Sequence, residues 1–210
     1  MRLASQVQSH ERKGMTVRIL KLAGLAAIGL AALTACSSMQ GAALYIGDER
    51  VSEDVIDGYV DDTVTSYIEY GADPAEFDYA ANREQTVLCL LFDELGKHLD
   101  LPEPDTGQAV SELDERCIAG QTHLNMIAAE AEPRELTEAE RAELRRLGWE
   151  FAQLPPQNQA DLMLSAGLAD LLSEYIEEYD IRVNPRYGVD VFPVMPEELD
   201  GLFDVEIPQR

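Results

Sequence analysis

Side chains that could bind a metal or act as nucleophiles are few in this chain, and their spacing does not bring them together. Cys89 and His98 are nine residues apart and Cys117 and His123 are six apart, so within a helix each pair points to divergent sides. No two of them stand at the helical spacing that completes a ligand set. The segment around Ser165 lacks the first glycine of a nucleophile elbow and has a helical pattern. We therefore expect no metal, no cofactor and no catalysis, with His98 and His123 on helix surfaces.

The N-terminal segment has the pattern of an export signal. Arg18 and Lys21 form a basic region ahead of an apolar run, from residue 22 to residue 33, that is rich in Leu, Ala and Gly. The run is too short to span a bilayer stably, which takes about 20 apolar residues. Small residues follow and lead directly to Cys36. The pattern predicts that residues 1–35 are a signal peptide and take no part in the fold.

The stretch Leu33-Thr34-Ala35-Cys36 resembles the lipobox of bacterial lipoproteins. The resemblance implies that Cys36 becomes the first mature residue and carries a lipid, which anchors the protein to the cell membrane on its extracytoplasmic face. The alternative is an ordinary secretory signal with a chance cysteine. Residues 1–14 add nothing that a signal needs, so Met15 is an alternative start of the chain.

Acidic residues dominate the chain, with 40 Asp and Glu against 16 Lys and Arg. Five of the basic residues and one of the acidic residues fall in residues 1–35, which leaves 11 basic and 39 acidic residues, a net charge of −28, in the remaining 175. Such a surface repels nucleic acid and anionic lipid headgroups. Membrane attachment is therefore expected through the lipid alone. The charge keeps the exported protein soluble, or attracts cationic partners.

Apart from Cys36 the chain has two cysteines, Cys89 and Cys117. An even number of cysteines in an exported chain favours a disulfide. Their midpoint falls at position 103, between Pro102 and Pro104. If two helices form an antiparallel hairpin around this turn, residues equidistant from it lie side by side. The alternative is two buried free thiols.

The apolar pattern predicts a mainly α fold of about five helices with a small β-hairpin. A short tether, residues 36–41, precedes two extended pieces around Gly47 and Asp48, and Ser52 is expected to cap the first helix. The second helix is expected from Asp73 to about Leu99. Because residues 87–92 are apolar all round, this helix is expected at the centre of the fold.

Three further helices follow in the sequence. The third is expected from about Thr106 to Ala131, with a heptad-like apolar seam. Thr137 and Glu140 form a capping box that opens the fourth, which is expected to reach Leu154. The fifth follows Pro155-Pro156 and has a wide apolar face up to Tyr179. Residues 189–210 contain three prolines and are expected to form an extended tail.

Two stretches resemble the N-terminal domain of SurA-type chaperones. The first is Ala42-Ala43-Leu44-Tyr45-Ile46-Gly47-Asp48 with Val51-Ser52 and the acidic amphipathic helix after it, and Asn82-Arg83 then precedes the central helix. The second is Val183-Asn184-Pro185-Arg186-Tyr187-Gly188, similar to the segment that closes this domain in small lipoproteins. Together they bracket residues 42–188. The resemblance implies a helical domain, related to the trigger-factor C-terminal domain, that cradles unfolded or extended polypeptide.

Related proteins often carry a parvulin-type prolyl isomerase domain, for which this chain has no room, so isomerase activity is not expected. The first interpretation is therefore a lipid-anchored, non-catalytic chaperone. Tyr59, Trp149, Phe151 and Tyr175 are its candidate peptide-binding residues, because aromatic side chains anchor peptide contacts. The competing assignment places all four in the core. The second interpretation is a structural lipoprotein that docks one specific envelope partner through its acidic face or its C-terminal segment.

Overall fold

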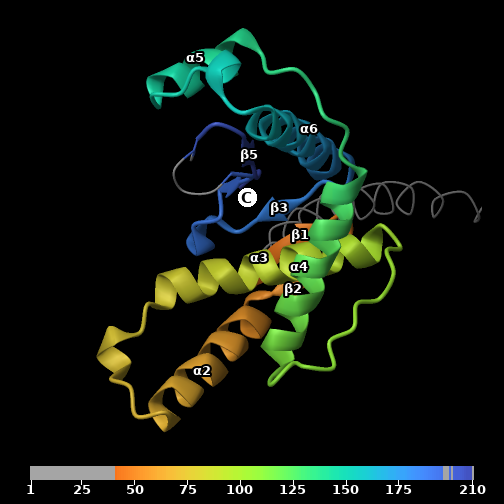
Figure 1. Cartoon of the computed structure of the whole chain (residues 1–210). Helices are drawn as coiled ribbons and strands as arrows, with labels where there is room; N and C mark the ends of the chain where they lie inside the picture. The colour runs from red at the N-terminus through yellow and green to blue at the C-terminus, as the bar shows by residue number, and fades with distance from the viewer. Residues whose placement is uncertain (1–40, 196–198, 200, 210) are drawn as a thin grey trace, which may run out of the picture. The chain divides into compact units, whose positions relative to one another are not determined.

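Five α-helices and five short strands are present in the described part of the chain. The computed structural model describes residues 41–195, 199 and 201–209, so the predicted signal segment, Met15 and Cys36 lie outside the described residues. The helices are α2 (Glu53–Glu69), α3 (Tyr79–His98), α4 (Glu112–Glu130), α5 (Glu138–Arg146) and α6 (Pro156–Glu178) (Figure 1). The strands are β1 (Ala42–Ile46), β2 (Glu49–Ser52), β3 (Arg182–Val183), β4 (Val191–Pro193) and β5 (Asp204–Glu206). The fold is mainly helical with small antiparallel strand pairs, as predicted.

The predicted hairpin is the edge of a three-stranded antiparallel sheet with the order β2-β1-β3. Gly47, with φ of +58°, makes the turn between β1 and β2. β1 is almost fully buried, and its Leu44 pairs with Val183 of β3, which brings the chain after α6 back to the first strand. The sheet therefore joins the two ends of the folded unit.

Helix α2 begins directly after Ser52, as predicted, although the Ser52 side chain makes no capping hydrogen bond. Its buried side chains are Ile56 and Val60, whereas Val55 and Ile68, which are also apolar, are exposed. The apolar side of α2 is wider than the contact that the helix makes with its neighbours. Much of this helix therefore faces solvent.

Helix α3 is the central helix, and it begins later than predicted. Asp73 and Pro74 open a short 3-10 turn, Pro74–Glu76, and Asp78 then caps α3 by accepting a hydrogen bond from the Ala81 amide, 3.0 Å. The apolar segment predicted to be central is buried, with Val87 and Leu90 at 0% exposure. The all-round apolar pattern thus identified the helix that the others pack against.

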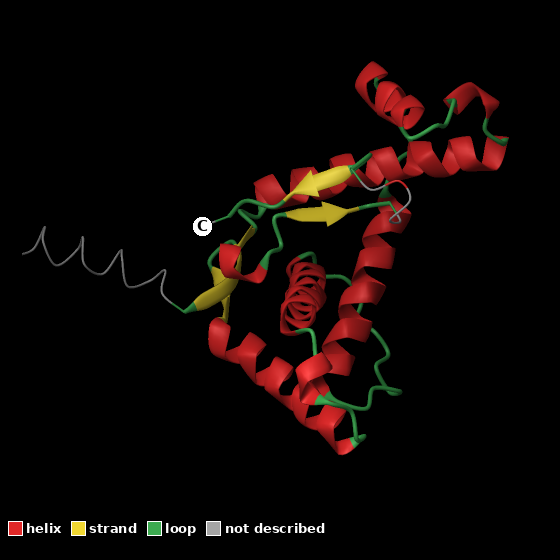
Figure 2. Cartoon of the chain, turned by 90° about the vertical axis from the view of Figure 1, so that its left-hand side faces the viewer, coloured by secondary structure: helices red, strands yellow, loops and turns green. Residues whose placement is uncertain are grey.

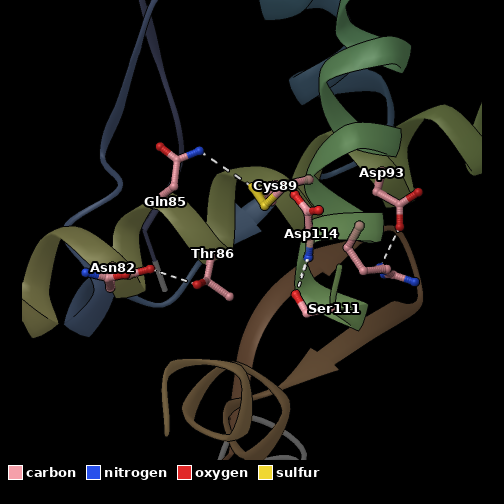
Figure 3. Close-up of a disulfide and its surroundings, with 9 residues drawn as sticks. Asn82, Gln85, Thr86, Cys89, Asp93, Ser111 and Asp114 are labelled. Carbon is pink, nitrogen blue, oxygen red and sulfur yellow. Dashed lines mark hydrogen bonds and ion pairs between the residues drawn. A yellow bond between two sulfur atoms is a disulfide. The ribbon is translucent and has the colours of Figure 1, made fainter. Parts of the chain in front are cut away.

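Cys89 of α3 and Cys117 of α4 form the predicted disulfide, with an S–S distance of 2.08 Å (Figure 3). The Gln85 side chain donates a hydrogen bond to the Cys89 sulfur, 3.5 Å. Ser111 caps α4 by accepting from the Asp114 amide, so this helix starts at Glu112 and not at Thr106.

The two bridged helices cross and do not form the antiparallel hairpin on which the cysteine prediction was based (Figure 1). Contacts advance along both helices together, from the Cys89–Cys117 bond to the close approach of Gly120 to Cys89 and Asp93, and then to His123 against Gly96. In an antiparallel pair, the residue numbers of the contacts would rise along one helix while they fall along the other. The long connection of residues 99–111 permits the parallel sense. The bond was predicted correctly from an incorrect geometry.

The capping box of α5 is present: Glu140 accepts from the Thr137 amide and Thr137 Oγ1 accepts from the Glu140 amide. The helix is shorter than predicted because Gly148, with φ of +92°, ends it after Leu147. A 3-10 turn, Phe151–Gln153, connects it to α6, which has the predicted bounds within a residue.

Residues 189–209 are not an extended tail outside the domain. β4 and β5 pair antiparallel, and Figure 2 shows the two strands running alongside α6. The buried side chains of this segment are Val189, Leu202, Phe203, Val205 and Ile207. Phe203, Val205 and Ile207 alternate along the chain, so one face of the strand enters the core. Pro193 is the last residue of β4 and Pro208 follows β5, so neither interrupts the pairing, and the domain extends beyond the predicted boundary at residue 188.

Candidate functional site

An open apolar pocket lies beside Trp149, at the end of α5. Gly148 turns the chain there, and the Trp149 amide donates to the Leu144 carbonyl, 3.0 Å, so the backbone of Trp149 is fixed. The indole remains 49% exposed. The pocket has a volume of about 280 Å³, and its aliphatic walls are Leu144, Leu154, Leu162, Met195 and Leu199. We call it the Trp149 pocket.

The polar lining of the Trp149 pocket is small. Asn158 and Asp161, both on the first turns of α6, are its only polar side chains among the described residues, and Asp161 is the only ionisable one. A lone carboxylate at the side of an apolar pocket favours a ligand that pairs an apolar group with a positive charge. It supplies no partner for acid–base chemistry.

Arg134 holds α5 against α6 and so fixes the shape of this region. Its guanidinium lies 2.6 Å from Glu140 Oε1 in α5 and 2.5 Å from Asp170 Oδ2 in α6. The hydrogen bond from Arg134 lowers the pKa of Glu140 to about 2, and the bonds from Thr137 act in the same direction. Gly167 of α6 supports the packing, because a Cβ there would lie 1.9 Å from the Glu132 carbonyl oxygen.

A second and larger cleft, the disulfide groove, lies over the Cys89–Cys117 bond. Its volume is about 590 Å³, and its apolar lining includes Leu88, Phe92, Ile118, Leu124 and Phe192. The rings of Phe92 and Phe192 meet edge to face with centroids 4.8 Å apart, which closes one wall with the C-terminal strand β4. Among the described residues, no ionisable side chain lines the groove, since the two cysteines are bridged.

The four aromatic residues predicted to bind peptide do not form one surface. Trp149 is exposed at a pocket, whereas Phe151 is 9% exposed and lies in the core, where Arg141 stacks over its ring at 4.8 Å. Tyr59 and Tyr175 are half-buried against the core on α2 and α6. One of the four is exposed, one is buried and two are half-buried, which the assignment of all four to the core does not describe.

The two tyrosines have specific local surroundings. The Tyr59 hydroxyl donates to Glu112 Oε1, 2.8 Å, and joins α2 to the start of α4. Burial and then the Glu112 contact raise the pKa of Tyr59 to about 12. Burial also raises the pKa of Tyr175, with a further contribution from Glu130. Both phenols therefore remain neutral donors at physiological pH.

The prediction for the histidines was right for one and wrong for the other. His98 is exposed, and its ring stacks edge to face on Tyr179 at 4.8 Å. His123 is only 1% exposed, because α4 turns this side toward Gly96 of α3. Next to it lies buried Asp93, in an ion pair with Arg116 at 2.6 Å.

Sequence reasoning missed Asp93 and Arg116 altogether. One signal was available: Asp93 directly follows the buried apolar run of α3, where a charge needs a partner. The partner could not be named without knowing which face of α4 meets α3.

The described residues contain no cluster of three or more side chains suited to hold a metal. Within the same residues, no helix is both long enough and apolar enough to cross a membrane. Comparisons with protein-family models, with curated proteins and with solved structures found no match.

Proposed function

We propose that this protein is a lipid-anchored, non-catalytic, chaperone-like protein that binds extended polypeptide segments on the extracytoplasmic face of the membrane. The binding surface is the Trp149 pocket, and its ligand is an apolar side chain flanked by Lys or Arg. The anchor is the lipid on Cys36. The resemblance of residues 42–188 to SurA-type domains points to the same class of ligand.

The observation that carries the proposal is the half-exposed indole beside an open aliphatic pocket. A Trp side chain has only two rotatable bonds and so loses little conformational entropy on binding, and Trp is enriched among residues that dominate binding energies. The pocket of about 280 Å³ accommodates one large apolar side chain but not a folded domain. An extended segment presents such side chains singly.

Charge supports a basic ligand. Asp161 lies at the pocket, and the chain as a whole has a net charge of −24. Long-range attraction raises the rate at which a cationic segment reaches an acidic surface, and this contribution falls with added salt. A neutral apolar peptide should bind more slowly and with little dependence on salt.

Trp149 allows a direct test, because it is the only tryptophan in the chain. Residues 41–210, which include every described core residue, are titrated with a Trp-free peptide of alternating Leu and Lys while indole emission is recorded. We expect a saturable blue shift as the indole leaves water. The matched peptide with Glu in place of Lys should bind at least fivefold more weakly at low salt.

Two variants distinguish peptide binding at the Trp149 pocket from nonspecific apolar binding. Trp149→Ala should weaken binding of a dye-labelled peptide by about fivefold or more, since truncating an anchor residue costs over about 1 kcal/mol. Tyr70→Ala is the control, because Tyr70 is 92% exposed at the end of α2. Suppression of aggregation of an unrelated denatured protein should follow the same order.

No peptide binding and no suppression at large excess would refute the chaperone proposal. Retention of a single envelope protein under those conditions would support the structural lipoprotein instead. A normal peptide affinity in Trp149→Ala would show that the Trp149 pocket is not the binding surface.

A further inference from the structure

Both ring nitrogens of His123 are buried and have no hydrogen-bond partner among the described residues. The nearest polar group is Asp93, whose Oδ1 lies 3.9 Å from His123 Nδ1, beyond hydrogen-bonding distance. Gly96 makes room for the ring, because a Cβ there would lie 2.1 Å from its Cγ. Buried polar groups in native proteins almost always have a partner, so an imidazole held in this way needs one.

The charged groups around His123 form ion pairs with one another, although the buried Arg116 Nε makes no hydrogen bond. Asp93 pairs with Arg116 at 2.6 Å and with Lys97 at 2.9 Å, and Glu94 pairs with both of the same cations, at 3.3 Å from Lys97. Two acids and two bases thus form a closed, neutral cluster. None of these charges is left over to bind an ion, and none lies within hydrogen-bonding distance of the imidazole.

His123 lines a pocket of about 390 Å³ on the side of the α3–α4 crossing away from the disulfide groove. Three exposed carboxylates stand at its rim, from Asp100, Glu103 and Glu115. None of the three has an ion-pair partner among the described residues, and Glu115 accepts only from Thr106 Oγ1, 3.3 Å. The rim therefore adds negative charge that the inner cluster does not neutralise.

We propose that this pocket binds a primary ammonium group. The ammonium donates one hydrogen bond to a ring nitrogen of His123, which in the neutral form is an acceptor, and its charge faces the three rim carboxylates. The ammonium is that of a small organic amine or of a lysine side chain in a polypeptide. The pocket volume of about 390 Å³ is sufficient for either alkyl chain.

Other ligand classes fit the charges less well. An anion would meet the rim carboxylates, while Arg116 and Lys97 are already paired with Asp93 and Glu94. A divalent metal would need Asp93 as a ligand, which Arg116 and Lys97 already hold, and the described residues offer no set of three ligands there. A ligand that donates a hydrogen bond and carries positive charge satisfies both the acceptor nitrogen of the imidazole and the rim carboxylates.

The test uses the full-length chain, purified in a nonionic detergent and labelled with 13C in its histidines. The chain has three histidines, so Gln substitutions at His98 and His123 assign the ring signals. Butylammonium is the probe, butanol of equal length is the uncharged control, and a short acetylated peptide with one Lys tests the second source. We expect a saturable shift of the His123 signal with butylammonium, none with butanol, and no shift of His98.

Substitutions of the rim carboxylates test the proposal without disturbing the fold. Glu103→Gln and Glu115→Gln change exposed side chains, and each should weaken butylammonium binding by about two- to fivefold, the range for exposed charge pairs. A shift with the Lys peptide alone assigns the site to polypeptides, and a shift with both probes shows that a free amine suffices. Absence of a saturable His123 shift with either probe overturns the proposal, as does an affinity unchanged in both rim variants.

Discussion

Gly120→Ala is expected to destabilise the protein although alanine is the better helix former. A Cβ at this position would lie 2.4 Å from the Cys89 carbonyl oxygen and 3.2 Å from the Asp93 amide nitrogen. Both atoms belong to the α3 backbone, so no side-chain rotation relieves the overlap. Alanine gains about 1 kcal/mol of helix propensity, whereas forcing a methyl group into a packed core costs about 1–3 kcal/mol. Because α3 itself must move, we expect the upper part of that range and a net loss of about 1–2 kcal/mol.

Gly58→Ala provides the matched control. Gly58 lies within α2 and is exposed, and beyond its own helix no atom lies within 4 Å of the position that an alanine methyl group would take. This change should stabilise the protein by about 0.5–1 kcal/mol. Urea denaturation of residues 41–210, followed by far-ultraviolet circular dichroism with the disulfide intact, measures both variants. The close crossing of α3 and α4 is refuted if Gly120→Ala is as stable as Gly58→Ala.

Four other changes test separate features. Cys36→Ala should abolish metabolic lipid labelling and membrane retention, and continued labelling would rule out the anchor at this residue. Replacing Cys89 and Cys117 together by Ala should lower the free energy of unfolding by about 3.5 kcal/mol, the chain-entropy value for a separation of 28 residues; mass analysis without reductant should show no alkylatable thiol at either position in the wild type. Phe92→Ala should cost about 3–5 kcal/mol in urea denaturation, since its ring is 6% exposed, and a loss below about 1 kcal/mol would contradict the central position of α3. Glu140→Gln should remove stability that the wild type has above pH 4.5 and loses as the pH falls toward 2, because its pKa is lowered in the folded state; an unchanged pH profile of unfolding between these values would exclude the Arg134 contact as the cause.

Local patterns were sufficient to predict most elements. The capping box at Thr137 and Glu140 and the apolar run of α3 each depend on residues within a few positions of one another, and both are present in the structure. The start of a helix was less predictable where more than one residue could serve as its N-cap. Asp73 and Asp78 can both open a helix, and the structure uses the first for a 3-10 turn and the second for α3.

Packing between elements was not predictable in the same way. The cysteine pair was predicted correctly because, with Cys36 set aside, each of the two remaining cysteines has one possible partner, which holds for any helix geometry. The direction of crossing depends on the long connection of residues 99–111, whose path the sequence does not encode in a short pattern. The C-terminal strand was missed because Pro193 and Pro208 suggested an irregular segment, although Val205 and Ile207 already alternate as a strand requires.

The candidate sites depend on these long-range contacts. The Trp149 pocket needs Met195 and Leu199 from the segment that was expected to be a tail, so the sequence could place Trp149 but not its pocket. His123 becomes buried only because Gly96 faces it across the crossing.

Gly96 and Gly120 together explain why the disulfide and the buried His123 both lie at the α3–α4 crossing. At Gly120 a Cβ would overlap the α3 backbone, so the glycine lets the two backbones approach closely, whereas at Gly96 a Cβ would overlap the His123 side chain. Close approach at Gly120 places the disulfide and the apolar groove on one side, while the space at Gly96 admits the His123 ring on the other. Since one crossing shapes both clefts, a substitution that separates the helices should alter the pocket beside His123 and the disulfide groove together. It should leave unchanged the Trp149 pocket, which is built from α5, α6 and the C-terminal segment.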